Sequence, residues 1–309
     1  MAHALKIRLG TRRSPLAMAQ AEEARARLCA AHGWEEGAVE LVPIEASGDR
    51  IQDRPLAEIG GKALWTRELD LWLGEGKIDA AVHSLKDVET IRPAELAIAA
   101  VLPRADKHDV LIGAASIQAL PQGALVGTSA PRRAAQLLHA RPDCRVIPFR
   151  GNVATRLAKV AAGEAEATFL AAAGLARLGE HGTGHPLALD EWLPAPAQAA
   201  IGIECRTDDR AVCDRLAAID HAPSRHEAMA ERALLAALGG SCHSPVAVLC
   251  DVLGEDIAMR AAILSPDGRE KVEGGSRFSV GDLDGPARLA ADLLRRASPA
   301  IAAHFAGSS

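Results

Sequence analysis

The stretch Leu5-Lys6-Ile7-Arg8-Leu9-Gly10-Thr11-Arg12-Arg13-Ser14-Pro15 sets a pattern that returns later in the chain. Its first five residues alternate between apolar and charged, as in a half-buried strand, and Ser14-Pro15 leads into an alanine-rich helix. A strand, a glycine turn and a helix start together present backbone N–H groups and a partial positive charge. Because arginine forks grip carboxylate or phosphate in pairs, the added arginines indicate a site for a polyanionic small molecule.

The arrangement returns twice. Leu125-Val126 leads through Gly127-Thr128-Ser129-Ala130 to Pro131 and Arg132-Arg133, and Val146-Ile147-Pro148-Phe149 leads into Arg150-Gly151-Asn152. The alternative is that single arginines are structural: Arg13, Arg25 and Arg27 on a solvated helix face, and Arg156 paired with an acidic neighbour. An exposed ion pair contributes only about 0–1 kcal/mol. These arginines can therefore hold a ligand firmly only if they lie in a cleft from which water is excluded.

The composition excludes several classes of protein. The chain has 309 residues, of which 49% are hydrophobic and 24% charged, which is typical of a soluble globular protein with two or three domains. A net charge of −5 argues against a general nucleic-acid binder. We find no secretory signal and no apolar membrane-spanning segment, so we expect a cytoplasmic protein without a membrane partner. The six cysteines show no metal-ligand spacing, so we expect neither a metal site nor disulfides.

The order of elements predicts an α/β fold with two similar lobes, like those of periplasmic binding proteins, a cleft between them, and a smaller C-terminal α+β domain. We place lobe 1 at 1–102 and 198–220, lobe 2 at 103–197, and the C-terminal domain at 221–309. Mostly parallel sheets are expected in the lobes and an antiparallel sheet at the C-terminus. The expected elements in lobe 1 are strands at 39–44, 78–82 and 96–101 and a helix near 64–73. In the C-terminal domain they are a helix ending at 238, strands at 246–249 and 257–264, a turn at 265–268 and a last helix opened by Pro286.

His83-Ser84-Leu85-Lys86-Asp87 follows a buried strand, and ligands of open α/β sheets bind beyond the carboxyl ends of strands. Asp87 is the best single candidate for handling a cation or a proton, and Lys86 beside it suits an anion. His83 suits proton transfer. The alternative is a structural loop, in which His83 only hydrogen-bonds the backbone.

Gly239-Gly240-Ser241-Cys242-His243 places a cysteine on a glycine loop after a helix, where a reactive partner can reach it. A neighbouring histidine favours the thiolate, the form that attacks electrophiles. From the residues alone, an inert thiol is the better interpretation. Gly60-Gly61-Lys62 also enters a helix, but it lacks the spacing of a phosphate-binding loop, so ATP use is not expected.

Taken in order, these segments resemble the porphobilinogen deaminase (hydroxymethylbilane synthase) family along nearly the whole chain. The resemblance rests on Gly10-Thr11-Arg12 with Ser14-Pro15-Leu16-Ala17, Gly60-Gly61-Lys62, His83-Ser84-Leu85-Lys86-Asp87-Val88, Gly127-Thr128-Ser129 with Arg132-Arg133, Arg150-Gly151-Asn152-Val153, Ala173-Gly174-Leu175 with Arg177-Leu178-Gly179, Gly202-Ile203-Glu204-Cys205-Arg206, and Gly240 with Cys242. The number and order of these motifs make the combination specific.

The resemblance implies a transferase of heme and tetrapyrrole biosynthesis that joins four porphobilinogen molecules head to tail, releases ammonia and, after hydrolysis, yields hydroxymethylbilane. It implies a dipyrromethane cofactor attached by a thioether to Cys242, and a monomer. Asp87 is then the catalytic carboxylate, which stabilises the azafulvene cation left by ammonia and assists proton transfers. The implied cofactor and substrate ligands are Arg12, Ser14, Lys86, Ser129, Arg132, Arg133, Arg150, Arg156 and Arg177. Supporting roles fall to Lys62, Trp65, His83, Ser84, Thr128 and Gly151.

The sequence departs from the family pattern at a few positions. Pro131 stands where leucine is common, Trp65 replaces a phenylalanine, Ala63 a glycine, and 197–200 a glycine-richer segment. Glycines there serve as a hinge or permit close backbone approach, so we expect their loss to affect loop motion.

Two other classes compete with this interpretation. A two-lobed anion-binding protein, such as a solute receptor or a regulator's effector domain, matches the lobes but does not explain Gly240-Ser241-Cys242. A cysteine hydrolase using Cys242 and His243 is less favoured, since adjacent side chains seldom align as nucleophile and base.

Overall fold

The computed structural model describes residues 5–45 and 66–305 of the chain. These residues form two compact units: the first lies within 1–105 and 199–225, and the second within 106–198 and 226–309. The chain therefore passes between the units at 105/106, at 198/199 and at 225/226. The predicted division into three domains stays a prediction.

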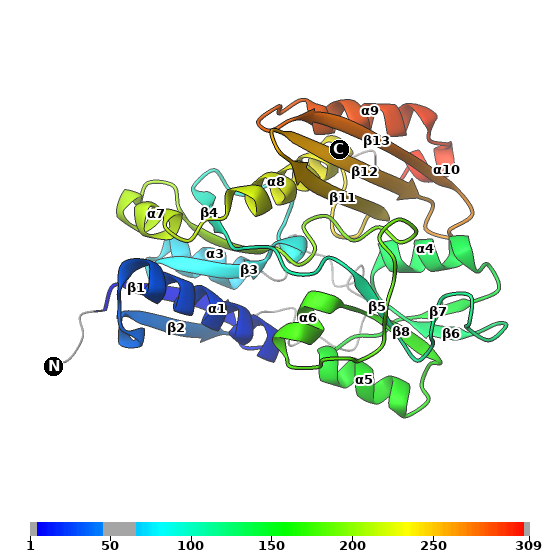
Figure 1. Ribbon diagram of the computed structural model, residues 1–309, viewed down its shortest axis with the longest axis horizontal. Coiled ribbons are helices and arrows are strands. Elements are labelled where there is room, and N and C mark those ends of the chain that lie inside the picture. Colours follow the sequence, from blue (N-terminus) through cyan, green and yellow to red (C-terminus); the bar gives the residue numbers. More distant parts are fainter. Residues whose placement is uncertain (1–4, 46–65, 306–309) are drawn as a thin grey trace. The chain divides into compact units, whose positions relative to one another are not determined.

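The first unit is built on a five-stranded sheet in the order β2-β1-β3-β10-β4 (Figure 1). Its strands are β1 (Ile7–Arg12), β2 (Val39–Ile44), β3 (Ala80–Ser84), β4 (Leu96–Val101) and β10 (Ile201–Arg206). β1 pairs in parallel with β2 and β3, whereas β10 is antiparallel to both β3 and β4. Four strands therefore run in one direction, as predicted, and β10 is the reversed one.

The second unit repeats this sheet. β5 (Asp109–Ile112), β6 (Leu125–Gly127), β7 (Arg145–Ile147), β8 (Ala167–Ala171) and β9 (His185–Pro186) are ordered β7-β6-β8-β5-β9. β6 is parallel to β7 and β8, and β5 is antiparallel to β8 and β9. In each sheet the reversed strand holds the fourth position and comes soon after the chain enters that unit. The predicted similarity of the two lobes is thus confirmed at the level of strand order and direction.

Helices cover these sheets. In the first unit they are α1 (Pro15–His32), η1 (Glu36–Ala38), α3 (Arg67–Gly74), η2 (Leu85–Asp87) and α7 (Arg210–Ala217). In the second they are α4 (Pro131–Ala140), α5 (Val153–Ala161) and α6 (Ala172–Arg177), and α8 (Ala222–Ala237) runs across 225/226. Leu28 on α1 packs against Leu9 and Val82 in a core cluster of the first sheet. The helix predicted near 64–73 is α3, of which only 67–74 is helical among the described residues.

An antiparallel sheet follows at the C-terminus, as predicted, and it has three strands. β11 (Val246–Leu253), β12 (Asp256–Leu264) and β13 (Lys271–Ser279) pair in chain order, and α9 (Gly285–Arg296) packs against β13 and β12. The prediction missed β13, because its run of glycines and polar residues lacks a hydrophobic alternation. It was also wrong that the helix at Pro286 is the last one, since Ser298 caps a further short helix, α10 (Pro299–Ala302).

Glycine stands in the first strand of each repeated motif, within β1 at Gly10 and at the end of β6 at Gly127, for a steric reason. A Cβ on Gly10 would lie 2.3 Å from the side chain of Ile78, and one on Gly127 would lie 2.3 Å from the ring of Phe149. Both distances are far below van der Waals contact, so only glycine lets the strand pass the neighbouring side chain. The repeated Gly-Thr of the sequence is therefore a packing requirement in both sheets.

Candidate active site

Most of the predicted site residues lie just beyond the carboxyl ends of strands. In the first unit Arg12 is the last residue of β1 and Ser14 follows it, and Lys86 and Asp87 follow β3. In the second unit the same edge of the sheet carries the residues that follow β6, β7 and β8, namely Thr128, Ser129, Arg132, Arg133, Arg150, Gly151, Arg156 and Arg177. Because parallel strands end at a common edge, each sheet gathers its polar side chains there.

Ser14 starts α1 as its N-cap. Its backbone is extended, with φ −63° and ψ 146°, and its Oγ accepts a hydrogen bond from Ala17 N at 3.3 Å. Pro15 then occupies the first helical turn, where a missing N–H costs nothing. Ser14 therefore fixes the turn that follows the half-buried Arg12.

Asp87 ends η2, a single turn of 3-10 helix directly after β3. Its side chain is half-buried, and no described residue donates a hydrogen bond to its carboxylate. Ser84 at the start of this turn is held by Gln20 of α1, whose Nε2 donates to the serine Oγ at 2.7 Å. The turn is thus anchored at its first residue while the carboxylate at its end keeps its oxygens for another partner.

A buried ionic network lies behind this turn. Glu204 of β10 is fully buried, and Arg92 donates to its two oxygens from Nε and Nη2, both at 2.9 Å. His83 Nε2 lies 3.1 Å from Glu204 Oε2, although the two atoms do not meet the geometry of a hydrogen bond. Burial alone would raise the pKa of Glu204, but His83 and Arg92 lower it to about 2.

His83 therefore faces a carboxylate within the fold. The sequence analysis did not consider this partner, and the role of His83 in proton transfer stays a prediction. Glu204 was part of a quoted motif, but the sequence reasoning gave it no role. The sequence did contain a signal for this role, because Glu204 is a charged residue within the apolar run Ile201–Cys205. A carboxylate that is buried with such a strand needs a partner in the fold.

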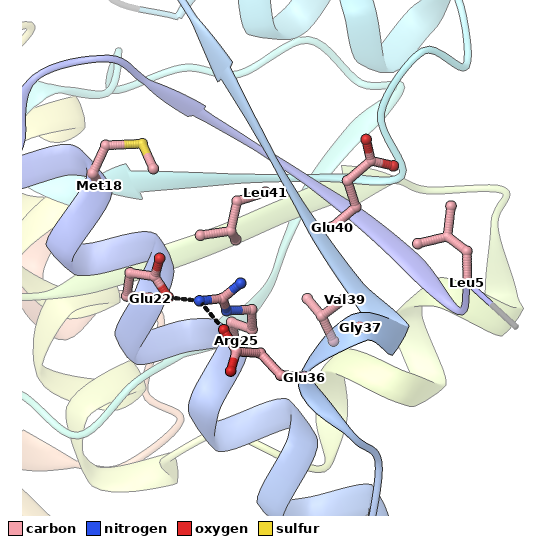
Figure 2. Close-up of a pocket in the computed structure, with 9 residues that line it drawn as sticks. All are labelled: Leu5, Met18, Glu22, Arg25, Glu36, Gly37, Val39, Glu40 and Leu41. Atoms are coloured by element: carbon pink, nitrogen blue, oxygen red, sulfur yellow. Dashed lines mark hydrogen bonds and ion pairs between the residues drawn. The ribbon is translucent and has the colours of Figure 1, made fainter. Parts of the chain in front are cut away.

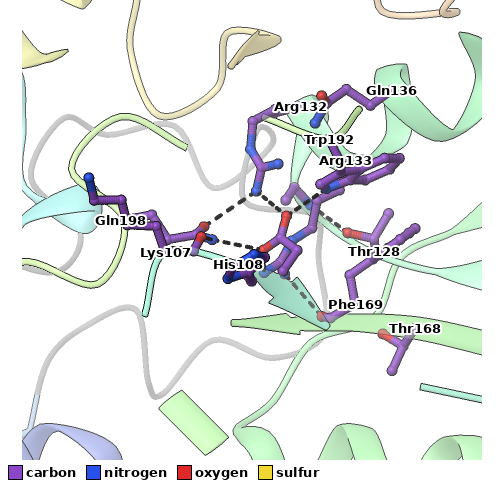
Figure 3. A network of polar contacts seen from close by, with 12 residues as sticks. Lys107, His108, Thr128, Arg132, Arg133, Gln136, Thr168, Phe169, Trp192 and Gln198 are labelled. Atoms are coloured by element: carbon purple, nitrogen blue, oxygen red, sulfur yellow. Dashed lines mark hydrogen bonds and ion pairs between the residues drawn. The ribbon is translucent and has the colours of Figure 1, made fainter. Parts of the chain in front are cut away.

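In the second unit Arg132 and Arg133 enclose the carboxylate of Asp109 (Figure 3). Arg132 Nη2 donates to Oδ2 at 2.8 Å and Arg133 Nη2 donates to Oδ1 at 2.7 Å. Trp192 Nε1 and Gln198 Nε2 add bonds of 2.9 and 3.0 Å to the same carboxylate. Burial raises the pKa of Asp109, but the charges of the two arginines and these hydrogen bonds hold it well below its usual range.

Both arginines of this pair are only 5% exposed. Arg132 Nη1 donates to the carbonyl of Leu193, and Arg133 Nη1 to that of Phe169. Among the described residues, no hydrogen-bond partner meets the Nε atom of either arginine. The sequence predicted the pair but missed Asp109, whose only signal was a charge at the start of the apolar strand Val110–Ile112.

The remaining ligand candidates of the second unit are half-buried. Ser129 Oγ donates to the carbonyl of Phe149 at 2.9 Å, which ties the loop after β6 to the loop after β7. Arg156 Nε donates to the carbonyl of Gly151 at 3.1 Å. Gly151 has φ +104°, which favours glycine, and Asn152 after it caps α5. Thr128 is buried, and Arg150 and Arg177 lie at the end of the β7 loop and at the end of α6.

Cys242 is the only exposed cysteine of the six, and no disulfide joins any of them. It lies in the turn between α8 and β11. Ser241 N donates to Ser244 Oγ and Ser244 N donates to Ser241 O, both at 3.0 Å, which closes the turn around Cys242. Gly239 before it has φ +65° and ends the helix in the left-handed conformation. The sequence predicted this accessible position on a glycine loop.

Two predicted supporting residues, Lys62 and Trp65, lie outside the described residues, as does Ala63. Pro131 opens α4, as its fixed φ favours. No helix in 5–45 or 66–305 has the length and apolar character of a membrane span. Over the same ranges, no group of three or more His, Cys, Asp and Glu is arranged to hold a metal ion.

An open hollow of about 620 Å³ lies on the first unit beside α1 and β2 (Figure 2). It is lined by Leu5, Met18, Glu22, Arg25, Glu36, Gly37, Val39, Glu40 and Leu41. None of the predicted site residues is among them. Arg25 within it forms ion pairs with Glu22 and Glu36, whereas the structural alternative considered for this arginine was a solvated helix face.

Comparison with known proteins identifies the class to which this fold and these residues belong. The family model described as "Porphobilinogen deaminase, dipyromethane cofactor binding domain" matches residues 7–214, and "Porphobilinogen deaminase, C-terminal domain" matches 226–295. The chain belongs to the porphobilinogen deaminase family.

Particular relatives agree with this assignment. The porphobilinogen deaminase of Sphingopyxis alaskensis is 56% identical over 97% of this chain and 96% of that protein. The porphobilinogen deaminase of Paracoccus denitrificans is 49% identical over 95% of each. Among solved structures, the Bordetella pertussis BvgS periplasmic VFT2 domain gives a TM-score of 0.41 at 15% identity, over 70% of this chain and 86% of that one. A likeness at that score supports no conclusion about function.

The matches confirm the predicted family, its deaminase activity as a transferase of tetrapyrrole biosynthesis, and the dipyrromethane cofactor. The alternative of a two-lobed anion-binding protein without catalysis is not favoured. The residue that attaches the cofactor and the residues that bind it stay predictions.

Proposed function

We propose that this chain carries its dipyrromethane on Cys242 and condenses four porphobilinogen molecules onto it, with Asp87 as the catalytic carboxylate. The exposure of Cys242 on a closed turn is the observation that carries the proposal, because a thioether can form only on a thiol that the pyrrole reaches. The other thiols are buried or half-buried. When bound, the cofactor supplies the terminal carbon to which the first substrate is joined.

The surroundings of Arg132 and Arg133 support a carboxylate-bearing ligand. Two buried guanidinium groups share one carboxylate, and their Nε–H groups have no partner among the described residues. A pyrrole acetate or propionate would supply both the missing charge and the missing acceptors. Arg12, Ser14, Lys86, Ser129, Arg150, Arg156 and Arg177 would bind further carboxylates of the growing chain.

Asp87 would stabilise the cation that forms when porphobilinogen loses ammonia. Its carboxylate ends a turn that is anchored through Ser84 and Gln20, so its position is set before the charge develops. A fixed carboxylate in this position lowers the energy of a transient positive charge and can take up the proton that the pyrrole carbon loses on coupling.

The attachment residue is tested by intact mass spectrometry of freshly purified protein. The wild type should carry a mass of two pyrrole units, and Cys242→Ser should carry none and be inactive. Cys29→Ser, at a half-buried thiol outside the site, is the matched control and should keep the adduct. An unmodified, active wild type would contradict the proposal, as would an adduct on the Cys242→Ser protein.

The proposal extends to a monomer in the cytoplasm that takes porphobilinogen as its small-molecule substrate and binds neither nucleic acid nor membrane. A net charge of −5 supports the last two points. Light scattering of the purified protein measures the oligomeric state, and a stable dimer would contradict this part.

A further inference from the structure

Asp109 and two backbone carbonyls take up some N–H groups of the arginine pair and leave others without an acceptor. It meets both arginines through the same nitrogen, Nη2, at 2.8 Å for Arg132 and 2.7 Å for Arg133. The Nη1 atoms donate to the backbone carbonyls of Leu193 and Phe169 at 2.9 and 3.0 Å. Among the described residues, this leaves the Nε–H of both guanidinium groups without an acceptor.

The Asp109 carboxylate is itself fixed. Trp192 Nε1 donates to Oδ2 and Gln198 Nε2 donates to Oδ1, so four donors surround the two oxygens (Figure 3). The carboxylate is fully buried, and the ring of Trp192 is stacked on Phe169 with centroids 5.0 Å apart. A carboxylate held in this way cannot rotate to follow the arginines, and it therefore sets their position.

The charges do not balance within the cluster. One carboxylate faces two guanidinium groups, so one positive charge is left over in a buried place. Buried charge without a counterion is unfavourable, and so is a buried donor without an acceptor. Both deficits are met by one further carboxylate.

We propose that Asp109 is a positioning residue, which holds Arg132 and Arg133 so that their Nε–H groups together receive one carboxylate of the bound pyrrole chain. The inference rests on the proposed function, since it takes the ligand to be a pyrrole with acidic side chains. Asp109 acts only through the arginines and does not touch the reacting atoms.

The test is Asp109→Asn, which keeps the size of the side chain but removes its charge and turns an N–H group toward one arginine. The share of purified full-length protein that carries the two-pyrrole adduct is measured by intact mass. We expect it to fall by about tenfold, as for the loss of a charge-assisted contact. Loading equal to that of the wild type would overturn the inference.

A stability-matched control separates positioning from folding. Leu120 lies in a core cluster of the second unit, and Leu120→Ala should lower the melting temperature while its loading stays complete. Leu120→Ala could instead carry less adduct, to an extent that follows the fall in its melting temperature. The effect of Asp109→Asn would then be explained by lost stability, and the inference fails.

Trp192→Phe provides a milder change if Asp109→Asn does not fold. It removes one donor to Asp109 and keeps an aromatic ring against Phe169. Apoprotein given porphobilinogen should then load about threefold more slowly than wild type, as for loss of one hydrogen bond. An unchanged loading rate would overturn the inference. A different result would contradict the proposed function itself, namely a wild-type protein that never carries the adduct.

Discussion

Three carboxylates of this protein differ in what surrounds them, and the difference separates a catalytic candidate from structural groups. Asp109 and Glu204 are fully buried and are held by arginines. Asp87 is half-buried and accepts no hydrogen bond from a described residue. Since a carboxylate that is already saturated with donors has little left to offer a substrate cation, Asp87 is the one suited to act on it.

We expect Asp87→Asn to keep the fold and to lower turnover by about 10²–10⁴-fold, the usual contribution of a positioned acid or base. Hydroxymethylbilane formation measures the loss. Asp79→Asn is the matched control, because Asp79 precedes the same strand at its other end and pairs with Arg8 at 2.7 Å. That variant should lose stability but keep its turnover. A rate for Asp87→Asn within tenfold of wild type would remove Asp87 from the mechanism.

At the scale of elements, the segment before β10 holds an unusual backbone. Ala197 has φ +57° and Ala199 has φ +68°, a left-handed conformation that favours glycine. The segment is held by its surroundings: Glu231, fully buried, accepts from Ala197 N at 2.6 Å, and Gln198 Nε2 donates to the carbonyl of Lys107 at 2.7 Å. The alanines noted in the sequence as departures from a glycine-richer pattern therefore store strain where the chain passes between the units.

Ala199→Gly should raise the free energy of unfolding by up to about 1 kcal/mol, because relief of the left-handed strain outweighs the entropy that glycine adds to the unfolded chain. Ala200→Gly is the control at a neighbouring residue whose φ is not positive, and it should cost about 0.5–1 kcal/mol. Chemical denaturation measures both. If the two substitutions change stability in the same direction, strain at Ala199 is not the cause.

In the whole molecule, each unit holds a fully buried carboxylate that arginine keeps ionised. Glu204 serves the first unit and Asp109 the second. Both have a folded-state pKa below the unfolded value. Such groups stabilise the fold fully above the unfolded pKa, and that contribution is lost as the pH falls through the folded pKa.

Wild-type stability should therefore fall steadily on acidification. For Glu204 the pKa moves from 4.5 to about 2, and a shift of that size corresponds to about 3 kcal/mol, lost between about pH 5 and about pH 2. Glu204→Gln should lack this part of the slope and be less stable at neutral pH. Glu164→Gln, at an exposed pair with Lys159, should keep the wild-type slope. Chemical denaturation across this pH range measures the free energy of unfolding of each variant. If its dependence on pH in Glu204→Gln equals that of the wild type, the role given to Glu204 is wrong.

Local sequence patterns were enough to predict most of the elements and the positions of the polar turns. Ser14-Pro15, Gly127-Thr128 and the glycines before Cys242 act through neighbours a few residues away, so capping and turn rules reach them. The order of motifs also gave the family. Local rules could not predict how β5 and β10 pair. Each of these strands runs antiparallel to a neighbouring strand that lies far away in the sequence.

Which charges are buried together could be seen only in the folded chain. Asp109 meets Arg132, Trp192 and Gln198, and Glu204 meets Arg92, across separations of 23 to 112 residues. Their partnership depends on the folded sheets, because a carboxylate loses its water there and must find its donors among whatever side chains the topology brings to it.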